Sequence, residues 1–224
     1  MKNAKAILSS YIGVLVFACT IYIAGGRVLY WQATLYLIVA LIGTTLNHLL
    51  LPGGSDLTTE RASRMSEGVK WDRILLGIIF LLNIVTFIVS GLDSGRYNWS
   101  AQFPLLLTVS GVFLMMLGQA LFAFAKRANS FFYSTVRIET KRNHIVCETG
   151  PYKFVRHPGY LGMIISILGF PLVMNSYWTY IPVVITIALI TLRTSLEDRY
   201  LKDKLDGYTS YTLKIRWRLI PFVY

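Results

Sequence analysis

The sequence predicts an all-α polytopic membrane protein, and two observations carry that prediction. Of its 224 residues, 54% are hydrophobic and only 15% are charged, whereas a soluble domain carries about 25% charged residues. Asp, Glu, Lys and Arg are absent from five long stretches, which are 6–26, 28–55, 74–92, 97–125 and 157–192. This composition excludes a disordered chain and an ordinary soluble enzyme.

Each charge-free stretch is long enough for a membrane span, which needs about 20 mostly apolar residues. The spans must be helices, because backbone groups in lipid have to be hydrogen-bonded within the segment. The stretch 6–26 follows two lysines, as a signal peptide does, but its apolar run is too long and lacks a small-residue cleavage pattern. We therefore expect it to be retained, and we expect one helix each from 28–55, 74–92 and 97–125.

The stretch 157–192 is too long for a single span, because a straight helix of that length would measure about 54 Å. Its middle, from Pro171 to Trp178, reads as a turn followed by interfacial aromatic residues. We therefore predict a helical hairpin with two short arms, 159–174 and 177–194. The total is about six membrane helices.

The distribution of Lys and Arg supports this hairpin. With it, 20 of the 22 cations share one face of the membrane, and only Arg27 and Arg96 lie on the other. A single last span would give 13 against 9. Because cytoplasmic loops are enriched in Lys and Arg, both termini are expected in the cytoplasm. The net charge of +11 then reflects basic loops beside anionic lipid headgroups, and no nucleic-acid partner is expected.

The predicted spans contain few polar side chains. Asn47, His48, Asn83 and Gln119 are the main ones, and we interpret them as interhelical hydrogen-bonding groups. Proton-coupled transporters need ionisable residues at depth, so a transporter is disfavoured. Any chemistry is therefore expected at the cytoplasmic face.

Two segments at that face form a candidate site at the mouth of the hairpin. Arg156 and His157 precede Pro158, which suits the first turn of a helix. Arg193 and Glu197 are four residues apart and share one helical face. The alternatives are a basic lipid anchor and a helix-end ion pair worth about 0.3–0.5 kcal/mol. The tail beyond 203 reads as an amphipathic interfacial segment.

Four motifs of this sequence resemble the isoprenylcysteine carboxyl methyltransferase family, and the related phospholipid methyltransferases share much of the pattern. The resemblance is strongest over 129–224, which we take as a catalytic region after an N-terminal region of four membrane helices, 1–128. It indicates a bacterial-type member, in the inner (plasma) membrane. The motifs are Gly150-Pro151-Tyr152, Arg156-His157-Pro158-x-Tyr160-x-Gly162, Glu197-Asp198 and Tyr208-x-x-Tyr211.

The resemblance implies an S-adenosylmethionine pocket on the cytoplasmic face, open to the membrane for a lipophilic or small methyl acceptor, with no metal. By position, Arg193 matches the residue assigned to the acceptor, and Arg156 is a secondary candidate. A carboxylate acceptor would need no base, whereas an amine or thiol would make His157 the candidate base. The implied cofactor contacts are His144, Ile145, Val146, Cys147, Tyr152, His157, Pro158, Tyr160 and Glu197.

Two other functions remain open from the sequence. NADPH-dependent sterol or enone reductases look similar through the Arg-His-Pro region, although Met163 stands where they have Asp. A non-catalytic membrane protein with a relic pocket is the third possibility. Within the methyltransferase pattern itself, Arg137 replaces a Gln that contacts the cofactor in the eukaryotic enzymes.

Overall fold

The computed structural model describes residues 2–50 and 68–224, and every regular element in these ranges is a helix. The prediction of an all-α protein is therefore confirmed. The elements are α1 (Lys2–Gly25), α2 (Trp31–Leu49), α4 (Lys70–Ser90), the π-helix η2 (Gly91–Tyr97), α5 (Leu105–Ala128), the short 3-10 helices η3 (Thr140–Arg142) and η4 (Gly150–Lys153), α6 (Pro158–Met174), α7 (Tyr180–Lys204) and α8 (Tyr208–Lys214).

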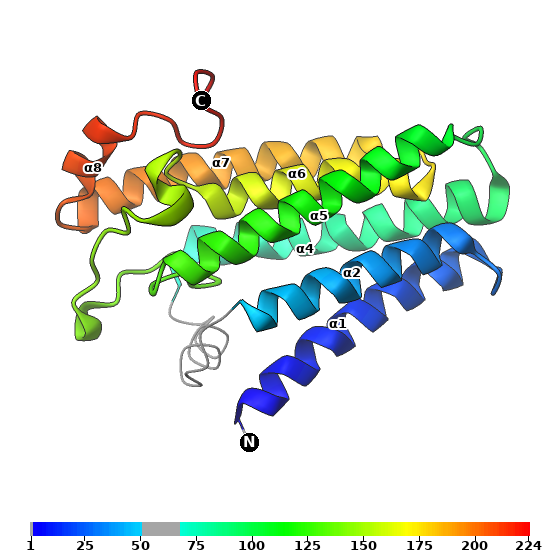
Figure 1. Cartoon of the computed structure of the whole chain (residues 1–224), viewed down its shortest axis with the longest axis horizontal. Helices are drawn as coiled ribbons and strands as arrows, with labels where there is room; N and C mark the ends of the chain where they lie inside the picture. Colours follow the sequence, from blue (N-terminus) through cyan, green and yellow to red (C-terminus); the bar gives the residue numbers. More distant parts are fainter. Residues whose placement is uncertain (1, 51–67) are drawn as a thin grey trace.

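The main helices lie side by side, and the chain reverses direction from each one to the next (Figure 1). The turns from α1 to α2, from η2 to α5 and from α6 to α7 lie at one end of the bundle. The loop between α5 and α6, with α8 and the C-terminal segment, lies at the other. We call this the loop end. The arrangement is the up-and-down layout that the charge distribution predicts.

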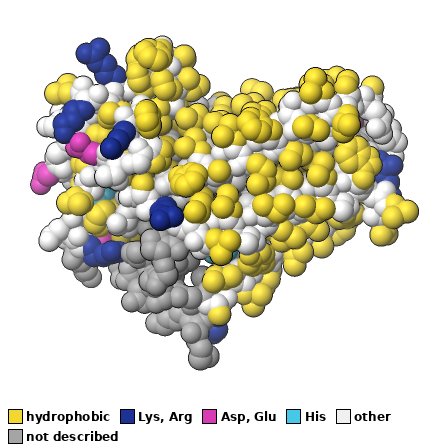
Figure 2. Space-filling view, in the orientation of Figure 1, with side chains coloured by type: hydrophobic (Ala, Val, Ile, Leu, Met, Phe, Trp, Pro, Cys, Tyr) yellow, Lys and Arg dark blue, Asp and Glu magenta, His cyan; other side chains and the backbone are white. Residues whose placement is uncertain are grey.

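Within residues 2–50 and 68–224, five helices are long and apolar enough to cross a membrane, namely those over Ile7–Gly25, Trp31–Leu49, Lys70–Tyr97, Leu105–Ala128 and Tyr180–Lys204. Hydrophobic side chains cover the middle of the visible face, and most charged side chains on it gather at the loop end (Figure 2). A lipid-facing body and one charged end are what a polytopic membrane protein requires.

The last two helices differ from the predicted short hairpin in one respect. The first arm is short, since α6 has 17 residues and falls below the length of a full span. The second arm is not short, because α7 has 25 residues and continues to Lys204. From the sequence we predict that this arm ends near Arg193, because charged residues usually lie outside the hydrocarbon core. In the structure Arg193 and Asp198 are buried against protein partners, so the helix continues through them.

A polar turn connects α6 to α7 and confirms the turn predicted in this region. Pro171 lies within the last turn of α6, and the helix ends where Asn175 takes a left-handed conformation with φ of 54°. The Asn175 side chain accepts a hydrogen bond from the Phe103 backbone N–H at 2.9 Å. Ser176 donates to Asp93, a fully buried carboxylate. These bonds anchor the turn to the segment before α5.

Glycine pairs hold α5 and α6 in close contact. A Cβ at Gly118 would lie 2.4 Å from the carbonyl oxygen of Gly162, and a Cβ at Gly169 would lie 2.4 Å from that of Gly111. Small residues at such positions let two membrane helices approach at the backbone. The start of α6, which carries the Arg-His-Pro motif, is thereby fixed against α5.

The polar side chains within the spans behave differently from expectation. The side-chain amides of Asn83 and Gln119 donate to carbonyl groups of their own helices, at 2.8 Å and 3.2 Å. In the described ranges, Asn47 Oδ1 and His48 Nε2 are buried and accept or donate no hydrogen bond. The interpretation of these groups as interhelical hydrogen bonds is therefore wrong for the described part of the chain.

Candidate functional site

A cavity of about 470 Å³ lies at the loop end, between the ends of α2 and α5, the loop after α5, the start of α6, α7 and α8. Pro158 does not line it; this residue is buried as the first residue of α6. The other residues predicted for the site all line the cavity. They are His144, Ile145, Val146, Cys147, Tyr152, Arg156, His157, Tyr160, Arg193 and Glu197.

Arg156 is bound entirely by the protein. Its Nε and Nη2 donate to the two oxygens of Asp198 at 2.7 Å and 3.1 Å. Its Nη1 donates to the carbonyl groups of Ile215 and Arg216, both at 2.7 Å. Arg218 also donates to Asp198, at 3.1 Å. Arg156 and Asp198 therefore join the start of α6 to α7 and to the C-terminal segment.

The backbone reinforces this joint. The N–H groups of Arg156 and His157 donate to the carbonyl groups of Trp217 and Arg218, both at 2.9 Å. The residue before a proline favours an extended conformation, and His157 accordingly lies outside the helix with φ of −126°. The C-terminal segment thus lies along the Arg-His-Pro motif.

His157 is buried in the same network. Its Nε2 lies 3.4 Å from Asp198 Oδ1 and 3.3 Å from the Tyr208 hydroxyl oxygen, and Tyr208 donates to Asp198 at 3.0 Å. The Nε2 atom is therefore engaged within the protein. Burial, with the neighbouring Asp198 carboxylate, raises the pKa of Tyr208 well above its usual range, which keeps the phenol neutral.

Arg193 pairs with Asp72, a partner that the sequence did not suggest. Arg193 Nε donates to Asp72 Oδ1 at 2.6 Å, and its Nη2 donates to the Ser134 carbonyl at 3.0 Å. Asp72 is fully buried and also accepts from the Val136 backbone N–H at 2.8 Å. Two signals were available. Asp72 stands just before the third charge-free stretch, and the segment Trp71-Asp72-Arg73 carries a weaker, upstream part of the family resemblance.

Glu197 is held by a neutral partner. The Tyr160 hydroxyl donates to Glu197 Oε2, and Glu197 forms no ion pair within the described ranges. The Arg193 guanidinium lies over the Tyr160 ring, 5.0 Å from its centroid. The His157 ring also stacks on the Tyr160 ring, with 5.8 Å between the two ring centroids. The cavity therefore contains a carboxylate whose charge no bonded cation neutralises.

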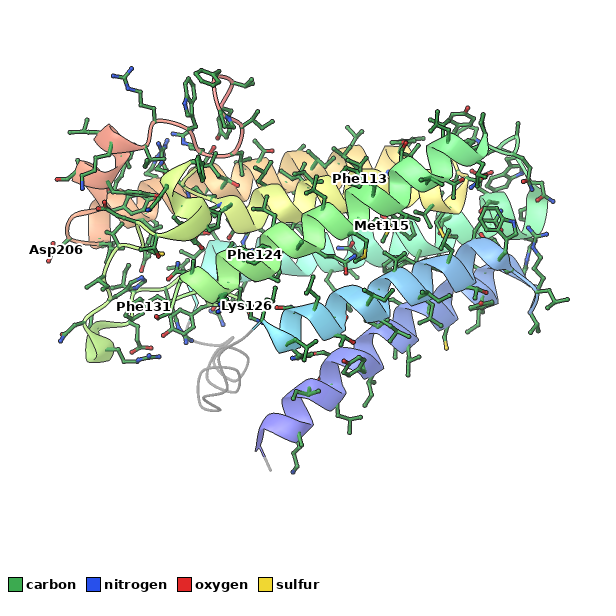
Figure 3. All side chains as sticks on the ribbon, in the orientation of Figure 1. Phe113, Met115, Phe124, Lys126, Phe131 and Asp206 are labelled. Atoms are coloured by element: carbon green, nitrogen blue, oxygen red, sulfur yellow. The ribbon has the colours of Figure 1, made fainter. Side chains whose placement is uncertain are left out.

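The loop after α5 supplies a further wall of the cavity. The His144 ring stacks on Phe131 at 4.3 Å, and its Nδ1 accepts from the Glu139 backbone N–H at 3.4 Å. Burial lowers the pKa of His144 to about 4, although the nearby Glu139 carboxylate opposes the shift. At neutral pH His144 is thus an uncharged hydrogen-bonding group. Phe131 and Lys126 lie toward the same end of the molecule as Asp206 (Figure 3).

Aromatic side chains near η4 complete this wall. The Tyr211 hydroxyl donates to the Tyr152 carbonyl at 2.7 Å, and the Asn129 amide lies 3.4 Å from the Tyr152 hydroxyl oxygen. Burial raises the pKa of Tyr152 well above its usual range. Cys147, a free thiol, donates to the Ala128 carbonyl at 3.4 Å. This part of the cavity is therefore neutral and largely aromatic.

Sequence reasoning missed one wall of the cavity. Asn47 and His48, from the end of α2, and Tyr133, from the loop after α5, line it with the predicted residues. The two α2 residues were noticed only as polar groups within a span, and nothing in the motifs pointed to them. No three His, Cys, Asp or Glu side chains gather at a possible metal site in the ranges 2–50 and 68–224.

A second cavity, of about 360 Å³, lies among α2, α4, α5, α6 and α7. Its walls are mainly apolar, with Phe87, Met115 and Phe170 among the lining residues. It shares four lining residues with the first cavity, and the two spaces therefore adjoin. The shared residues are Thr44, Asn47, Phe122 and Met163.

Comparison with known proteins confirms the family resemblance. Residues 110–203, from α5 to the last turn of α7, match the model of the Isoprenylcysteine carboxyl methyltransferase (ICMT) family. The chain is also similar to the Cobalt-zinc-cadmium resistance protein CzcN of Cupriavidus metallidurans (strain ATCC 43123 / DSM 2839 / NBRC 102507 / CH34), with 28% identity over 133 residues. That match covers 57% of this chain and 56% of the relative, so the chain spans about half the length of the protein it matches.

Proposed function

We propose that this membrane protein, whose residues 110–203 match the ICMT family, transfers a methyl group from S-adenosylmethionine to a lipophilic or small acceptor at the cytoplasmic face of a bacterial inner membrane. One observation carries the proposal. The segments that carry the family motifs converge on one cavity at the loop end, where Tyr152, His157, Tyr160 and Glu197 meet.

The residues present fit the proposed cofactor. A cavity of about 470 Å³ falls within the range of about 300–1,000 Å³ that small-molecule sites occupy. S-adenosylmethionine would supply an already reactive methyl group on a positively charged sulfur. Glu197, which has no ion-pair partner in the described ranges, suits the cofactor's amino group or ribose. The neutral wall of His144, Ile145, Val146, Cys147 and Tyr152 suits the adenosine.

The protein's own part in the reaction is to align the two reactants and to exclude water. The Asp198 joint holds the C-terminal segment against the start of α6, which fixes the segment that carries the Arg-His-Pro motif. The adjoining cavity among the helices offers an apolar acceptor a route from the membrane. The cavity at the charged loop end and the apolar cavity beside it support a donor that enters from water and an acceptor that enters from lipid.

Charge supports the cytoplasmic location of this site. Among the Lys and Arg residues that the structure describes, only Arg27 and Arg96 lie near the opposite end of the bundle. The basic loop between α5 and α6 and the basic C-terminal segment both lie at the loop end. The positive-inside rule assigns the loop end to the cytoplasm, where S-adenosylmethionine is made. Both termini are then cytoplasmic.

Binding of S-adenosylhomocysteine to the purified full chain tests the cofactor assignment. We expect saturable binding that Glu197→Ala weakens about ten- to hundredfold, because a hydrogen bond to a charged group contributes about 1.5–3 kcal/mol. Asp203→Ala is the matched control, since Asp203 is an exposed carboxylate on the same helix. Absence of saturable binding, or equal affinity in wild type and Glu197→Ala, would contradict the proposal.

Membranes supplied with methyl-labelled S-adenosylmethionine test the transfer itself. We expect label in a lipid or a small molecule, and identification of that product names the acceptor. Tight NADPH binding that S-adenosylhomocysteine does not compete with would favour the reductase instead. Binding of S-adenosylhomocysteine without transfer to any membrane extract would favour a non-catalytic protein.

A further inference from the structure

We infer that the end of α2 and the loop after α5 form the polar part of the acceptor site, and that this site takes a lipophilic acceptor with a protic head, such as an alcohol, an amine or a thiol, in preference to a carboxylate. The residues concerned are Asn47, His48 and Tyr133. The inference rests on the proposed methyltransferase function and names the substrate class for its acceptor half.

The first observation is a cluster of unsatisfied polar atoms. Asn47 Oδ1, His48 Nε2 and the Tyr133 hydroxyl are buried, and none has a hydrogen-bond partner among the residues that the structure describes. A buried polar atom without a hydrogen bond destabilises the folded protein, and native proteins contain few such atoms. All three residues line the same cavity as Glu197 and Arg193. Their clustering on one cavity wall points to a ligand that supplies the missing partners.

Contacts with neighbouring side chains hold two of these residues in place. The His48 ring lies 5.9 Å from the ring of Tyr11, centroid to centroid. The Arg137 guanidinium carbon lies 3.8 Å from the centroid of the Tyr133 ring. Both contacts involve the ring faces and leave the polar atoms unused. A preorganised group of this kind binds a ligand at a low cost in side-chain entropy.

The chemistry of the three atoms selects the ligand. An amide oxygen such as Asn47 Oδ1 only accepts hydrogen bonds, whereas an imidazole nitrogen and a phenol can each accept or donate. A hydroxyl, an amine or a thiol has a hydrogen to donate to Asn47. An ionised carboxylate has none, and it would face the Asn47 oxygen with a like partial charge.

The ion pairs of the arginines around the cavity also argue against a carboxylate acceptor. Arg193 is paired with Asp72 at 2.6 Å, Arg156 with Asp198 at 2.7 Å, and Arg137 lies 4.0 Å from Glu139. At Arg193 and Arg156, a carboxylate acceptor would have to compete with a buried carboxylate that already holds the guanidinium. Arg137 Nε donates no hydrogen bond within the described ranges, but the Glu139 carboxylate lies close enough to balance the charge of the guanidinium. Charge on these arginines therefore does not favour an anionic acceptor, in contrast to the role that the family resemblance implied for Arg193.

His48 is also the group that takes up the proton which a protic acceptor loses on methylation. As the acceptor's lone pair forms a bond to the methyl carbon, the carbon–sulfur bond breaks, its electrons neutralise the sulfonium, and the acceptor must lose its proton. The unpartnered His48 Nε2 receives that proton and becomes a cation, so charge is conserved. His157, the residue expected for this task, is engaged with Asp198 and Tyr208 through its own Nε2.

The second cavity provides space for the rest of such an acceptor. Asn47 lines both cavities, together with Thr44, Phe122 and Met163. A polar head at Asn47 therefore places an attached hydrocarbon chain at the entrance to the apolar space among the helices. The acceptor is an amphiphile whose head meets α2.

The test uses a matched series of long-chain alkyl compounds that differ only in the head group, namely an alcohol, an amine, a thiol and a carboxylic acid at neutral pH. The full chain is held in lipid nanodiscs with saturating S-adenosylhomocysteine, and binding is read as a rise in unfolding temperature, without turnover. We expect the protic compounds to stabilise the wild type and the acid to have little effect. With S-adenosylmethionine in its place, the protic compounds should be methylated.

Three variants assign the head-group contacts. Asn47→Leu, His48→Phe and the conservative Tyr133→Phe should each weaken binding of the protic compounds about tenfold, since each removes one hydrogen bond worth roughly 1.5 kcal/mol. His48→Phe should also lower kcat. The affinity for S-adenosylhomocysteine should stay within about twofold of wild type, which checks that each variant is folded. Leu49→Phe, at an exposed neighbour on the same helix, should change neither affinity.

The outcomes separate this inference from the proposed function. If the wild type does not bind S-adenosylhomocysteine, the proposed function fails. If it does bind, and the acid stabilises it as well as the protic compounds, or no protic compound binds, the inference about the acceptor is overturned. Unchanged binding of the protic compounds in all three variants would overturn the assignment to α2 and Tyr133.

Discussion

Arg193 and Asp72 illustrate what single residues of this sequence do and do not reveal. The sequence predicted that Arg193 would face a site near the membrane boundary, and the residue does line the cavity. Its partner could not be predicted, because Asp72 lies 121 positions away and a lone carboxylate before an apolar stretch has many possible partners. Motifs identify residues that share a cavity, whereas the pairing among them depends on how the helices pack.

The Arg193–Asp72 pair yields a prediction about stability. Asp72→Asn and Arg193→Gln should each destabilise the protein by about 3–5 kcal/mol, because each leaves a buried charge without its partner. The double variant should lose much less than the sum of the two losses, since it removes both charges. Thermal or denaturant unfolding of the purified chain measures the stability of the wild type, of the two single variants and of the double variant.

Arg199→Gln serves as the control for this cycle, because Arg199 is an exposed cation on the same helix. Its effect on the free energy of unfolding should be small. Strictly additive losses at Asp72 and Arg193 would show that the two side chains do not stabilise each other in solution.

At the scale of whole elements, charge-free stretches identified the membrane helices well because lipid tolerates few charges. The same criterion failed at α7, where Arg193, Glu197 and Asp198 are accommodated by Asp72, Tyr160 and Arg156. A charged residue in a sequence can face water or a buried partner, and the two cases look alike. The helix therefore continues about ten residues beyond its predicted end.

The packing of α5 on α6 yields a prediction at this scale. Gly118→Ala should destabilise the protein by about 1–3 kcal/mol, the usual cost of overpacking, because the added Cβ would lie 2.4 Å from both the Gly162 oxygen and the Ser166 nitrogen. Affinity for S-adenosylhomocysteine should fall as well, since α6 carries the Arg-His-Pro motif. Unfolding measurements and binding titrations read the two effects.

The matched control is Gly77→Ala on α4, where an added Cβ would meet nothing within 4 Å. That variant should be as stable as the wild type and should bind S-adenosylhomocysteine equally well. Equal behaviour of the two alanine variants would show that α5 and α6 are not in close contact at Gly118.

At the scale of the whole molecule, the number and direction of the helices followed from the count of Lys and Arg on each side. The count of Lys and Arg could distinguish a hairpin from a single last span, because the charge asymmetry is large and the connecting loops are short. The shape of the cavity and the contribution of α2 to it could not be predicted in the same way. They depend on which helices become neighbours in space, and loop charges do not specify this.

Orientation in the membrane is directly testable with single cysteines in a Cys19→Ser, Cys147→Ser background. Val28→Cys, in the exposed turn after α1, and Asp206→Cys, at the loop end, lie at opposite ends of the bundle. In bacterial cells with a permeabilised outer membrane, an impermeant thiol reagent should label Val28→Cys. It should label Asp206→Cys only after the inner membrane is broken. The reverse pattern would place the cavity on the periplasmic side.

The hydrogen bonds between Arg156, His157 and residues 215–218 have a consequence for the order of events during synthesis. The ribosome makes residues 215–218 after the described helices α1 to α7, so these helices are synthesised before the carbonyl groups that hold Arg156 exist. The nascent chain therefore passes through a stage in which Arg156 and His157 have been made but lack these backbone partners. The hydrogen bonds that fix the Arg-His-Pro motif are therefore completed late, once the tail has been translated.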